Sequence, residues 1–368
     1  MKVSFFTPVI EYKARRQEFD MAISNVLEEG CFILGKEVMK FEAQVKAYTG
    51  CKYAVGVASG TDGLTIASDL LDFRNNREVI TSPFTFLASS SCIARLGGVP
   101  VFVDIDASTL SIDPNQIEYR ITKKTAGILP VHLFNQMADM DGIMDISYRH
   151  NLKVLEDAAQ AFGMNQGKGY AGTLGDMGVF SFFPTKTLGA YGDGGMIITN
   201  NESLYELALK YRTHGASSKY SYEYLGYNSR LDELQAAILN IKLNYIDESI
   251  KKRRQAAIWY IEGLKGCDGI KPVIPEDDKN PVYYVFNVLS ERRSELCKAL
   301  KENNIGFSIY YPLPLHLQKC FSYLGYKEGD FPIAERISHE ILALPMYPEL
   351  THEEISHVCH TIRRFYMG

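Results

Sequence analysis

Short, mainly apolar segments alternate with amphipathic ones through the first half of the chain, and this alternation restricts the fold more than any other feature. The apolar segments have the length of buried strands and lie at Tyr53–Ala58, Glu78–Thr81, Val99–Asp104, Ala126–Val131 and Leu152–Glu156. Helical patterns separate them, as at Ala88–Arg95. Such alternation predicts an α/β fold, in which helices cover both faces of a mostly parallel sheet.

Two amphipathic helices precede this region, and two further strands extend it. Apolar residues at helical spacing run up to Gly30 and again up to Gly50, and glycine commonly follows the last turn of a helix. The apolar segments Val179–Phe183 and Met196–Thr199 add two strands to the expected sheet.

The pattern changes after Asn200, where strands become fewer. Helices are expected at Leu204–Tyr211, Leu231–Tyr245, Ile246–Leu264, Arg292–Asn303, Ile333–Leu342 and Glu353–Tyr366, strands at Val282–Leu289 and Phe307–Tyr311, and a polar loop at Asp277–Pro281. A chain of 368 residues suits one large and one smaller domain. We therefore expect a large domain over residues 1–245 and a smaller α+β domain over residues 246–368.

Charge, cysteine content and hydropathy disfavour several classes of protein. The net charge is -5, and the short basic run at residues 251–254 is typical of a solvated helix face, so a nucleic-acid partner is not expected. The seven cysteines form no CxxC pair, which disfavours a disulfide framework and favours the cytoplasm. The sequence has no uncharged apolar run of about 18 residues, and the first apolar stretch is too short for a signal peptide, so no membrane span is expected.

One lysine, Lys186, lies between two apolar strands within Val179–Asn200, in a turn that is rich in glycine. A desolvated lysine shifts its pKa readily, which suits Schiff-base chemistry with a carbonyl compound. The competing interpretation is a solvated loop lysine beside glycines that permit a tight turn. This stretch alone does not decide between the two.

A run of small polar residues, Ser59 to Gly63, stands between a strand and a helix. Backbone N–H groups at such a helix start can bind a phosphate. A simple helix cap by serine or threonine explains the same residues equally well. The run matches neither GxGxxG nor GxxxxGK[ST], so dinucleotide-binding and P-loop interpretations lose support.

Asp157 follows the strand Leu152–Glu156, at the edge of the sheet where ligands of α/β proteins bind. Its carboxylate could bind a metal, a ribose hydroxyl or a protonated ring nitrogen, or it could cap the next helix. No metal is expected, because His132 and His150 are isolated in the sequence.

Taken together, these residues are of the types that a pyridoxal-phosphate-binding site requires. An aspartate keeps the pyridine ring protonated, a lysine binds the aldehyde, and small polar residues hold the phosphate. Ser181 could add a hydroxyl to the phosphate site, and Phe86 could supply a face for the ring, although a core aromatic is its simpler interpretation.

Several longer motifs make the sequence recognisable. EDAAQAFG (156–163), FSFFPTKTLGAYGDGG (180–195) and GYNSRLDELQAAIL (226–239) closely resemble the DegT/DnrJ/EryC1/StrS family of pyridoxal-phosphate sugar aminotransferases. The resemblance covers essentially the whole chain and extends to SGTDGL (59–64) and YYPLPLHLQ (310–318). It implies the fold of aspartate aminotransferase (fold type I), with a mixed, mostly parallel seven-stranded sheet in the large domain.

The resemblance also implies roles for residues of this chain toward the cofactor. Lys186 would form the Schiff base and later carry the proton, and Asp157 would pair with the ring nitrogen. The other matching positions would contact the ring or the phosphate: Gln160 beside the ring hydroxyl, Phe86 on the ring face, and Gly60, Thr61 and Ser181 at the phosphate. Asn228 would reach the phosphate from a neighbouring subunit, which implies a homodimer with shared active sites.

The resemblance further implies residues near the sugar. Arg230, Tyr311 and His316 correspond to positions near the nucleotide-sugar pocket. Tyr191 and His214 could line the same pocket, but packing within their loops is the simpler role.

The activity implied by the resemblance is transfer of an amino group from glutamate to a nucleotide-linked keto sugar. Residues 81–106 and 212–239 look most like members that aminate C3 of a dTDP-3-keto-6-deoxyhexose or a UDP-2-acetamido-3-keto sugar. Amination at C4 of a UDP- or GDP-4-keto-6-deoxy sugar is the alternative, because those members share most of the motifs. A sugar 3-dehydratase is disfavoured, since such members carry histidine in place of Lys186. A regulator without turnover is disfavoured by the intact pair of Lys186 and Asp157.

Overall fold

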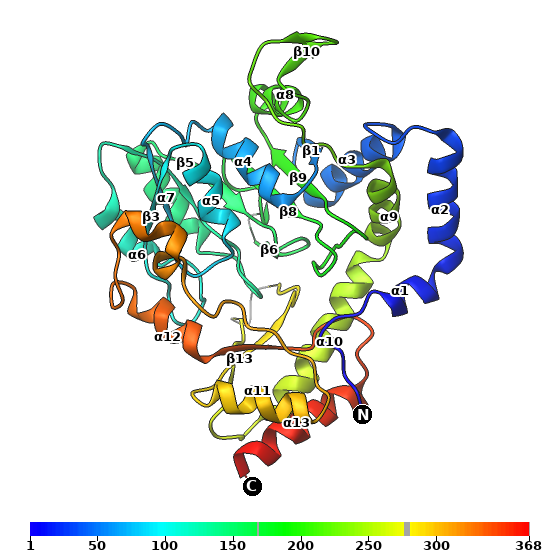
Figure 1. Ribbon diagram of the computed structural model, residues 1–368, viewed down its shortest axis with the longest axis vertical. Coiled ribbons are helices and arrows are strands. Elements are labelled where there is room, and N and C mark those ends of the chain that lie inside the picture. The colour runs from blue at the N-terminus through cyan, green and yellow to red at the C-terminus, as the bar shows by residue number, and fades with distance from the viewer. Residues whose placement is uncertain (168, 276–279, 368) are drawn as a thin grey trace.

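The computed structural model describes residues 1–167, 169–275 and 280–367, and the loop expected at residues 277–281 lies mostly outside this description. A larger α/β domain stands above a smaller α+β domain, and both chain ends lie beside the smaller one (Figure 1). No helix in the described ranges combines the length and the apolar character needed to cross a membrane.

The larger domain is organised around one sheet with the strand order β1-β9-β8-β5-β4-β2-β3. Its strands are β1 (Tyr53–Val57), β2 (Glu78–Thr81), β3 (Val99–Phe102), β4 (Thr125–Leu129), β5 (Lys153–Asp157), β8 (Met177–Ser181) and β9 (Gly195–Thr199). β9 runs antiparallel to both β1 and β8, and the other neighbouring pairs are parallel. The expected mixed, mostly parallel seven-stranded sheet is confirmed.

Each strand contributes alternate side chains to two separate cores. In β9, Met196 and Ile198 pack into one core and Ile197 into the other; in β5, Val154 and Leu155 divide in the same way. Successive side chains of a strand point to opposite faces, so a sheet covered on both sides needs apolar residues at nearly every position. The continuous apolar runs of the sequence therefore follow from this two-sided burial.

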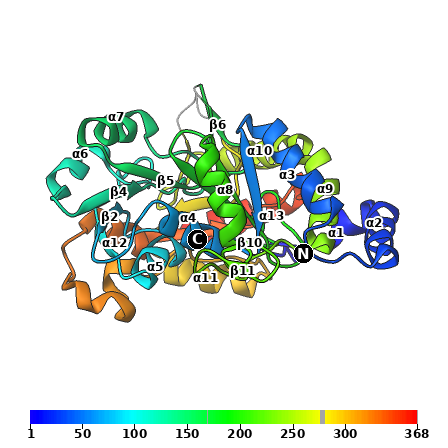
Figure 2. The same ribbon diagram turned by 90° about the horizontal axis from the view of Figure 1, so that it is seen from above.

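Helices cover both faces of the sheet. In Figure 2, α4 and α5 lie on one side of β4 and β5, and α7 lies on the other. The helices of the larger domain are α1 (Val9–Ala14), α2 (Arg16–Glu29), α3 (Lys36–Thr49), α4 (Gly60–Leu70), α5 (Ala88–Arg95), α6 (Pro114–Ile117) with the 3-10 turn η1 (Glu118–Arg120), α7 (Met140–His150), α8 (Glu202–Tyr211) and α9 (Glu233–Asn244). Gly30 and Gly50 end α2 and α3 with positive φ angles of 66° and 75°, as the sequence predicts.

The smaller domain contains a three-stranded antiparallel sheet in the order β12-β13-β14. Its elements are α10 (Ile246–Leu264), β12 (Lys271–Pro272), β13 (Phe286–Leu289), α11 (Arg293–Glu302), η2 (Leu315–Leu317), η3 (Lys319–Leu324), α12 (Pro332–Glu340), β14 (Ile341–Leu344) and α13 (His352–Met367). Val3 packs into the core of this domain and bridges to Ile305. The division at residue 245 stays a prediction, and the first residues pack with the second part of the chain.

Two expectations for the smaller domain are wrong, and a third is right only in part, because the strand expected from Val282 begins at Phe286. Residues 307–311 form no strand: Ser308 makes only an isolated bridge to Ala343. The helix expected to run to Leu342 ends at Glu340, because Ile341–Leu344 is a strand that pairs with β13. Ile341 and Ala343 of this strand pack into one core, and Leu342 and Leu344 into another.

Two short hairpins lie outside the main sheets. The first pairs β6 (Asn165–Gln166) with β7 (Gly169–Tyr170), and the second pairs β10 (Ala216–Ser218) with β11 (Ser221–Tyr222). The second hairpin projects from the top of the larger domain in Figure 1.

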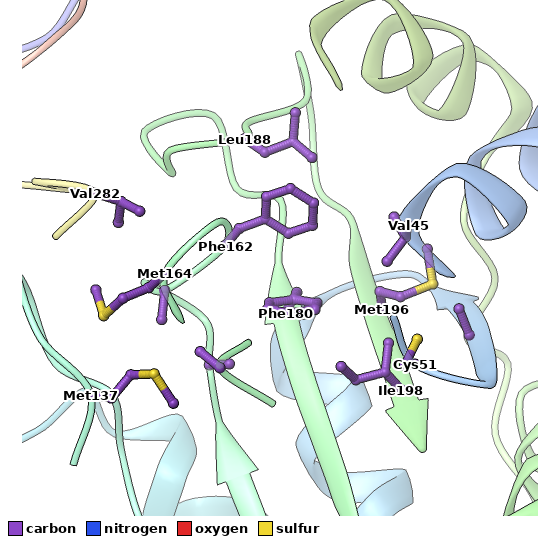
Figure 3. Close-up of a cluster of buried hydrophobic side chains, with 14 of the residues drawn as sticks. Val45, Cys51, Met137, Phe162, Met164, Phe180, Leu188, Met196, Ile198 and Val282 are labelled. Atoms are coloured by element: carbon purple, nitrogen blue, oxygen red, sulfur yellow. The ribbon is translucent and has the colours of Figure 1, made fainter. Parts of the chain in front are cut away.

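The glycine-rich loop between β8 and β9 is anchored by one of its apolar side chains. Leu188 is buried in the same core as Phe162, Phe180 and Met196 (Figure 3). The backbone N–H of Ala190 also donates to the Phe182 carbonyl, at 2.8 Å. This loop carries Lys186, so the packing of Leu188 helps to fix the position of the Lys186 backbone.

Candidate active site

A cavity of about 600 Å³ opens at the carboxyl ends of the parallel strands, where the smaller domain meets the sheet. Residues at or just beyond the ends of β1, β2, β4, β5 and β8 line it, together with a segment before β13: Ser59, Thr85, Val131, Asp157, Ser181 and Tyr284. Parallel strands bring their carboxyl ends to one edge of a sheet, which is why residues far apart in the sequence meet here.

Asp157 ends β5 and lies at the floor of this cavity, only 4% exposed. Its Oδ2 accepts a hydrogen bond from Ser89 Oγ at 2.6 Å, and its Oδ1 accepts from the backbone N–H of Ala159 at 3.1 Å. Each carboxylate oxygen has more than one lone pair, so both can still accept a further donor. Asp157 therefore presents an oriented acceptor to the cavity.

Lys186 reaches the same cavity from the loop after β8. Burial lowers the pKa of its ammonium group from 10.5 to about 8, and the negative charge of Asp157 opposes that shift. Its Nζ lies 4.6 Å from the centre of the Tyr284 ring, whose hydroxyl lies 3.2 Å from Thr185 Oγ1. A lysine with this pKa is partly neutral near pH 8 and can act as a nucleophile.

Gln160 connects the floor of the cavity to the smaller domain. Its Oε1 accepts from the backbone N–H of Phe134 at 3.0 Å, and its Nε2 donates to the Tyr311 hydroxyl at 3.1 Å. Burial raises the pKa of Tyr311 well above 10, so the phenol keeps its proton. Because the Tyr311 oxygen accepts from Gln160, its own proton can be donated to another group in the cavity.

The start of α4 forms the small polar end of the cavity. Ser59 caps the helix by accepting from the Asp62 N–H at 3.1 Å, so the capping interpretation of this run is correct. Gly60 and Thr61 follow it and also line the cavity, with Ser181 opposite. A Cβ at Gly60 would lie 2.7 Å from Ser181 Cβ, so only glycine fits there. Capping leaves the first N–H groups of the helix free to bind an anion in addition.

Two aromatic side chains stand at the mouth of the cavity. Phe86 is 57% exposed although it lines the cavity, and Phe183 is 50% exposed. The Phe86 ring lies 6.4 Å from the Tyr311 ring. Phe86 is therefore not a core aromatic, and its face is open to a ligand.

Other residues considered from the sequence lie away from this cavity as the described residues form it. Asn228 is exposed and bridges to Thr213 in an antiparallel pair, and Arg230 is half-buried two positions further on. His316 is fully buried, with Nε2 3.0 Å from Glu335 Oε1 and its ring 4.7 Å from Phe331.

The two loop residues also lie elsewhere. Tyr191 packs against Phe19, with ring centres 5.3 Å apart, and Lys242 Nζ lies 4.2 Å from its ring centre. His214 is exposed, and its backbone N–H donates to the Tyr227 carbonyl at 2.8 Å.

Sequence reasoning missed several groups at this site. Ser89 contacts Asp157 and Tyr284 lines the cavity, and neither was singled out; Thr185 and Asp193 also line the cavity and lie within the motif at 180–195, but no role was assigned to them. Their partners are distant in the chain, so only the fold reveals them. Within residues 1–167, 169–275 and 280–367, no three His, Cys, Asp or Glu side chains are grouped so that they could hold a metal ion.

Comparison with known proteins now decides the family. The model of the DegT/DnrJ/EryC1/StrS aminotransferase family matches residues 13–363. The chain belongs to this family. Several of its relatives carry names that state an aminotransferase or transaminase reaction.

Three relatives align with nearly the full chain. The "pleiotropic regulatory protein" of Geobacillus stearothermophilus is 46% identical, covering 97% of this chain and 96% of its own. The dTDP-3-amino-3,6-dideoxy-alpha-D-galactopyranose transaminase of Aneurinibacillus thermoaerophilus is 42% identical, with coverage of 95% and 96%. The UDP-N-acetyl-3-dehydro-alpha-D-glucosamine 3-aminotransferase of Acidithiobacillus ferrooxidans is 39% identical, with coverage of 98% for both.

A solved structure agrees with the fold. The crystal structure of S. venezuelae DesV in complex with a ketimine intermediate superposes with a TM-score of 0.97 at 37% identity, covering 100% of this chain and 99% of that chain. The fold-type-I architecture expected from the sequence is thus confirmed.

Proposed function

We propose that this protein is a pyridoxal-phosphate-dependent aminotransferase that moves an amino group from glutamate to the C3 ketone of a nucleotide-linked keto sugar. The observation that carries the proposal is the meeting of Lys186 and Asp157 in one cavity, the first from the loop after β8 and the second from the end of β5. Membership of an aminotransferase family supports the same reaction class.

The residues of the cavity fit pyridoxal phosphate. At one end, the start of α4 and Ser181 surround a position where a Cβ at Gly60 would collide, so the backbone can approach a phosphate closely. At the floor, Asp157 presents an acceptor for a protonated ring nitrogen. Lys186 supplies an amine of lowered pKa for the aldehyde. Phe86 offers an open ring face, and Gln160 and Tyr311 would supply hydrogen-bond donors for the ring hydroxyl.

Bound pyridoxal phosphate supplies an electron sink that stabilises negative charge at the substrate carbon. The residues of this chain then perform the proton transfers. Lys186 Nζ, once free, is the group that removes and returns the proton, because its pKa of about 8 lies near neutral pH. Asp157 would hold the ring nitrogen protonated by accepting its hydrogen bond.

Amination at C3 is supported by two relatives whose names state a C3 amino sugar, one linked to dTDP and one to UDP. The C4 ketone of a UDP- or GDP-linked sugar is the second candidate substrate. A 3-dehydratase is disfavoured by Lys186, and a regulator without turnover, which the name of the Geobacillus relative suggests, is disfavoured by the pair of Lys186 and Asp157 in one cavity.

A second copy of the chain would complete the site. Asn228 is exposed and outside the cavity of its own chain, so its role at a phosphate requires the cavity of a partner. Phe86 and Phe183 leave the mouth open, and a partner would cover it. A homodimer with shared sites is therefore part of the proposal, and Arg230 beside Asn228 would lie near the nucleotide diphosphate.

The test loads the purified protein with cofactor and glutamate, offers a panel of dTDP-, UDP- and GDP-linked 3-keto and 4-keto sugars, and follows nitrogen gain by mass spectrometry and NMR. We expect amination at C3 of one nucleotide series. Lys186→Ala should abolish turnover, whereas the exposed Lys123→Ala should leave it unchanged. Bound cofactor without conversion of any sugar would favour the regulatory role, and full turnover by Lys186→Ala would overturn the assignment of the lysine.

A further inference from the structure

Asp157 is held by a serine that does not itself reach the cavity. Ser89 lies on α5, is 0% exposed and donates from Oγ to Asp157 Oδ2 over 2.6 Å. A hydroxyl this close to a carboxylate makes a short, charge-assisted hydrogen bond. The second carboxylate oxygen accepts from the Ala159 N–H, so the plane of the carboxylate is fixed at two points.

The hydroxyl of Ser89 is oriented in turn by Thr85. The two side-chain oxygens lie 3.1 Å apart, and Thr85 is 3% exposed. An ionised carboxylate can only accept, so the single proton of Ser89 must point to Asp157. Thr85 is then the donor to Ser89, and the three groups form a chain with one direction, Thr85 to Ser89 to Asp157.

We propose that Ser89 is a positioning residue, which holds the Asp157 carboxylate in the orientation that the cofactor ring nitrogen requires, and that Thr85 fixes the hydroxyl of Ser89. The proposal rests on the cofactor assignment above. Ser89 is not among the residues that line the cavity, so its effect on the cofactor must pass through Asp157.

The neighbouring serine provides a matched control. Ser90 follows on the same helix and is also 0% exposed, but its Oγ has no hydrogen-bond partner among the described residues. Ser89→Ala and Ser90→Ala therefore remove the same atom from equally buried positions, and only the first breaks the contact with Asp157. Thermal unfolding of both apoproteins shows whether either change acts through the fold.

The readouts are the affinity for pyridoxal phosphate and the pH midpoint of the absorbance band of the bound cofactor. We expect Ser89→Ala to weaken cofactor binding about tenfold, the scale of a hydrogen bond to a charged group. The midpoint should move to higher pH, because a ring held less firmly in its protonated state withdraws fewer electrons from the nitrogen that joins it to Lys186. Ser90→Ala should change neither quantity.

Thr85→Val tests the direction of the hydrogen bonds from Thr85 to Ser89 to Asp157. Alone it should shift the midpoint in the same direction as Ser89→Ala but less. In the Ser89→Ala background it should add less than it does alone, because the part of its effect that passes through Ser89 is already lost. If Ser89→Ala does not fold, the shift in Thr85→Val decides, and an unchanged midpoint overturns the proposal.

The positioning role of Ser89 is also overturned if the midpoint is unchanged in Ser89→Ala, or if Ser90→Ala shifts the midpoint equally. It is overturned as well if Thr85→Val has its full effect in the Ser89→Ala background. A wild-type protein that develops no cofactor band would instead reject the proposed function, so the two failures are distinguishable.

Discussion

His132 Nε2 lies 2.8 Å from Glu156 Oε2, with both side chains 0% exposed, and Glu156 immediately precedes Asp157 in β5. The backbone N–H of Ala138 donates to His132 Nδ1 at 3.1 Å, so Nδ1 carries no proton and Nε2 is the donor to the carboxylate. Glu156 also accepts from three backbone N–H groups of the loop before β8, those of Gly172, Leu174 and Gly175, at 2.6 to 2.8 Å. One buried carboxylate thus joins the end of β5 to two loops.

Glu156→Ala is expected to destabilise the protein by about 3–5 kcal/mol, because it leaves His132 and three backbone donors buried without their acceptor. Urea denaturation of the apoprotein measures the change. The exposed Glu328→Ala is the control and should stay within about 0.5 kcal/mol of the wild type. A loss below 1 kcal/mol for Glu156→Ala would show that the network is not a major source of stability.

The uptake of pyridoxal phosphate by the apoprotein should depend on pH through Lys186. Only the neutral amine attacks an aldehyde, and burial lowers the pKa of this lysine to about 8. The rate should therefore rise with pH, reach half its maximum near pH 8 and level off above it, whereas an ordinary lysine would still gain rate near pH 10. Stopped-flow absorbance between pH 6.5 and 10 measures the profile. A rate still rising at pH 10 would mean that the amine is solvated in the apoprotein.

Much of this architecture follows from local sequence patterns. The strands of the large sheet are continuous apolar runs because both faces are covered, and the helix ends at Gly30 and Gly50 need residues that adopt positive φ. Asp157 and Lys186 lie at or after the ends of strands, where ligands of α/β proteins bind. Each of these features depends on residues close to it in the sequence, so it can be predicted from the local pattern.

Other features depend on partners far away in the chain. Ser89 and Asp157 are 68 positions apart, and Thr185 and Tyr284 are 99 apart, so neither pair produces a local pattern. The strand β14 continues directly from α12 without a glycine or proline between them, and its apolar residues fit a helix equally well. Pairing with β13 decides its conformation, and that pairing is not visible in the sequence.

His316 is expected to support the fold rather than contact the sugar. Its side chain is buried between Glu335 and Phe331, and burial lowers the pKa of the imidazole. His316→Gln should lower the free energy of unfolding by about 1–3 kcal/mol, while the KM for the keto sugar changes less than twofold. Denaturant unfolding and steady-state kinetics test the two parts separately. A tenfold rise in KM at unchanged stability would instead support the substrate contact that the family resemblance implies.

The close approach of Gly60 to Ser181 predicts a specific defect and its partial repair. An alanine Cβ at position 60 would lie 2.7 Å from Ser181 Cβ, so Gly60→Ala must push the start of α4 away from the end of β8. We expect a loss of about 1–3 kcal/mol in stability, typical of overpacking, together with weaker cofactor binding, because the N–H groups that face the phosphate move.

Adding Ser181→Gly to Gly60→Ala removes the atom that collides and should restore most of the stability. It should not restore cofactor affinity fully, since the Ser181 hydroxyl is lost as well. Urea unfolding and cofactor titration of the single and double variants measure both effects, and equal stability of Gly60→Ala and wild type would contradict the expected collision.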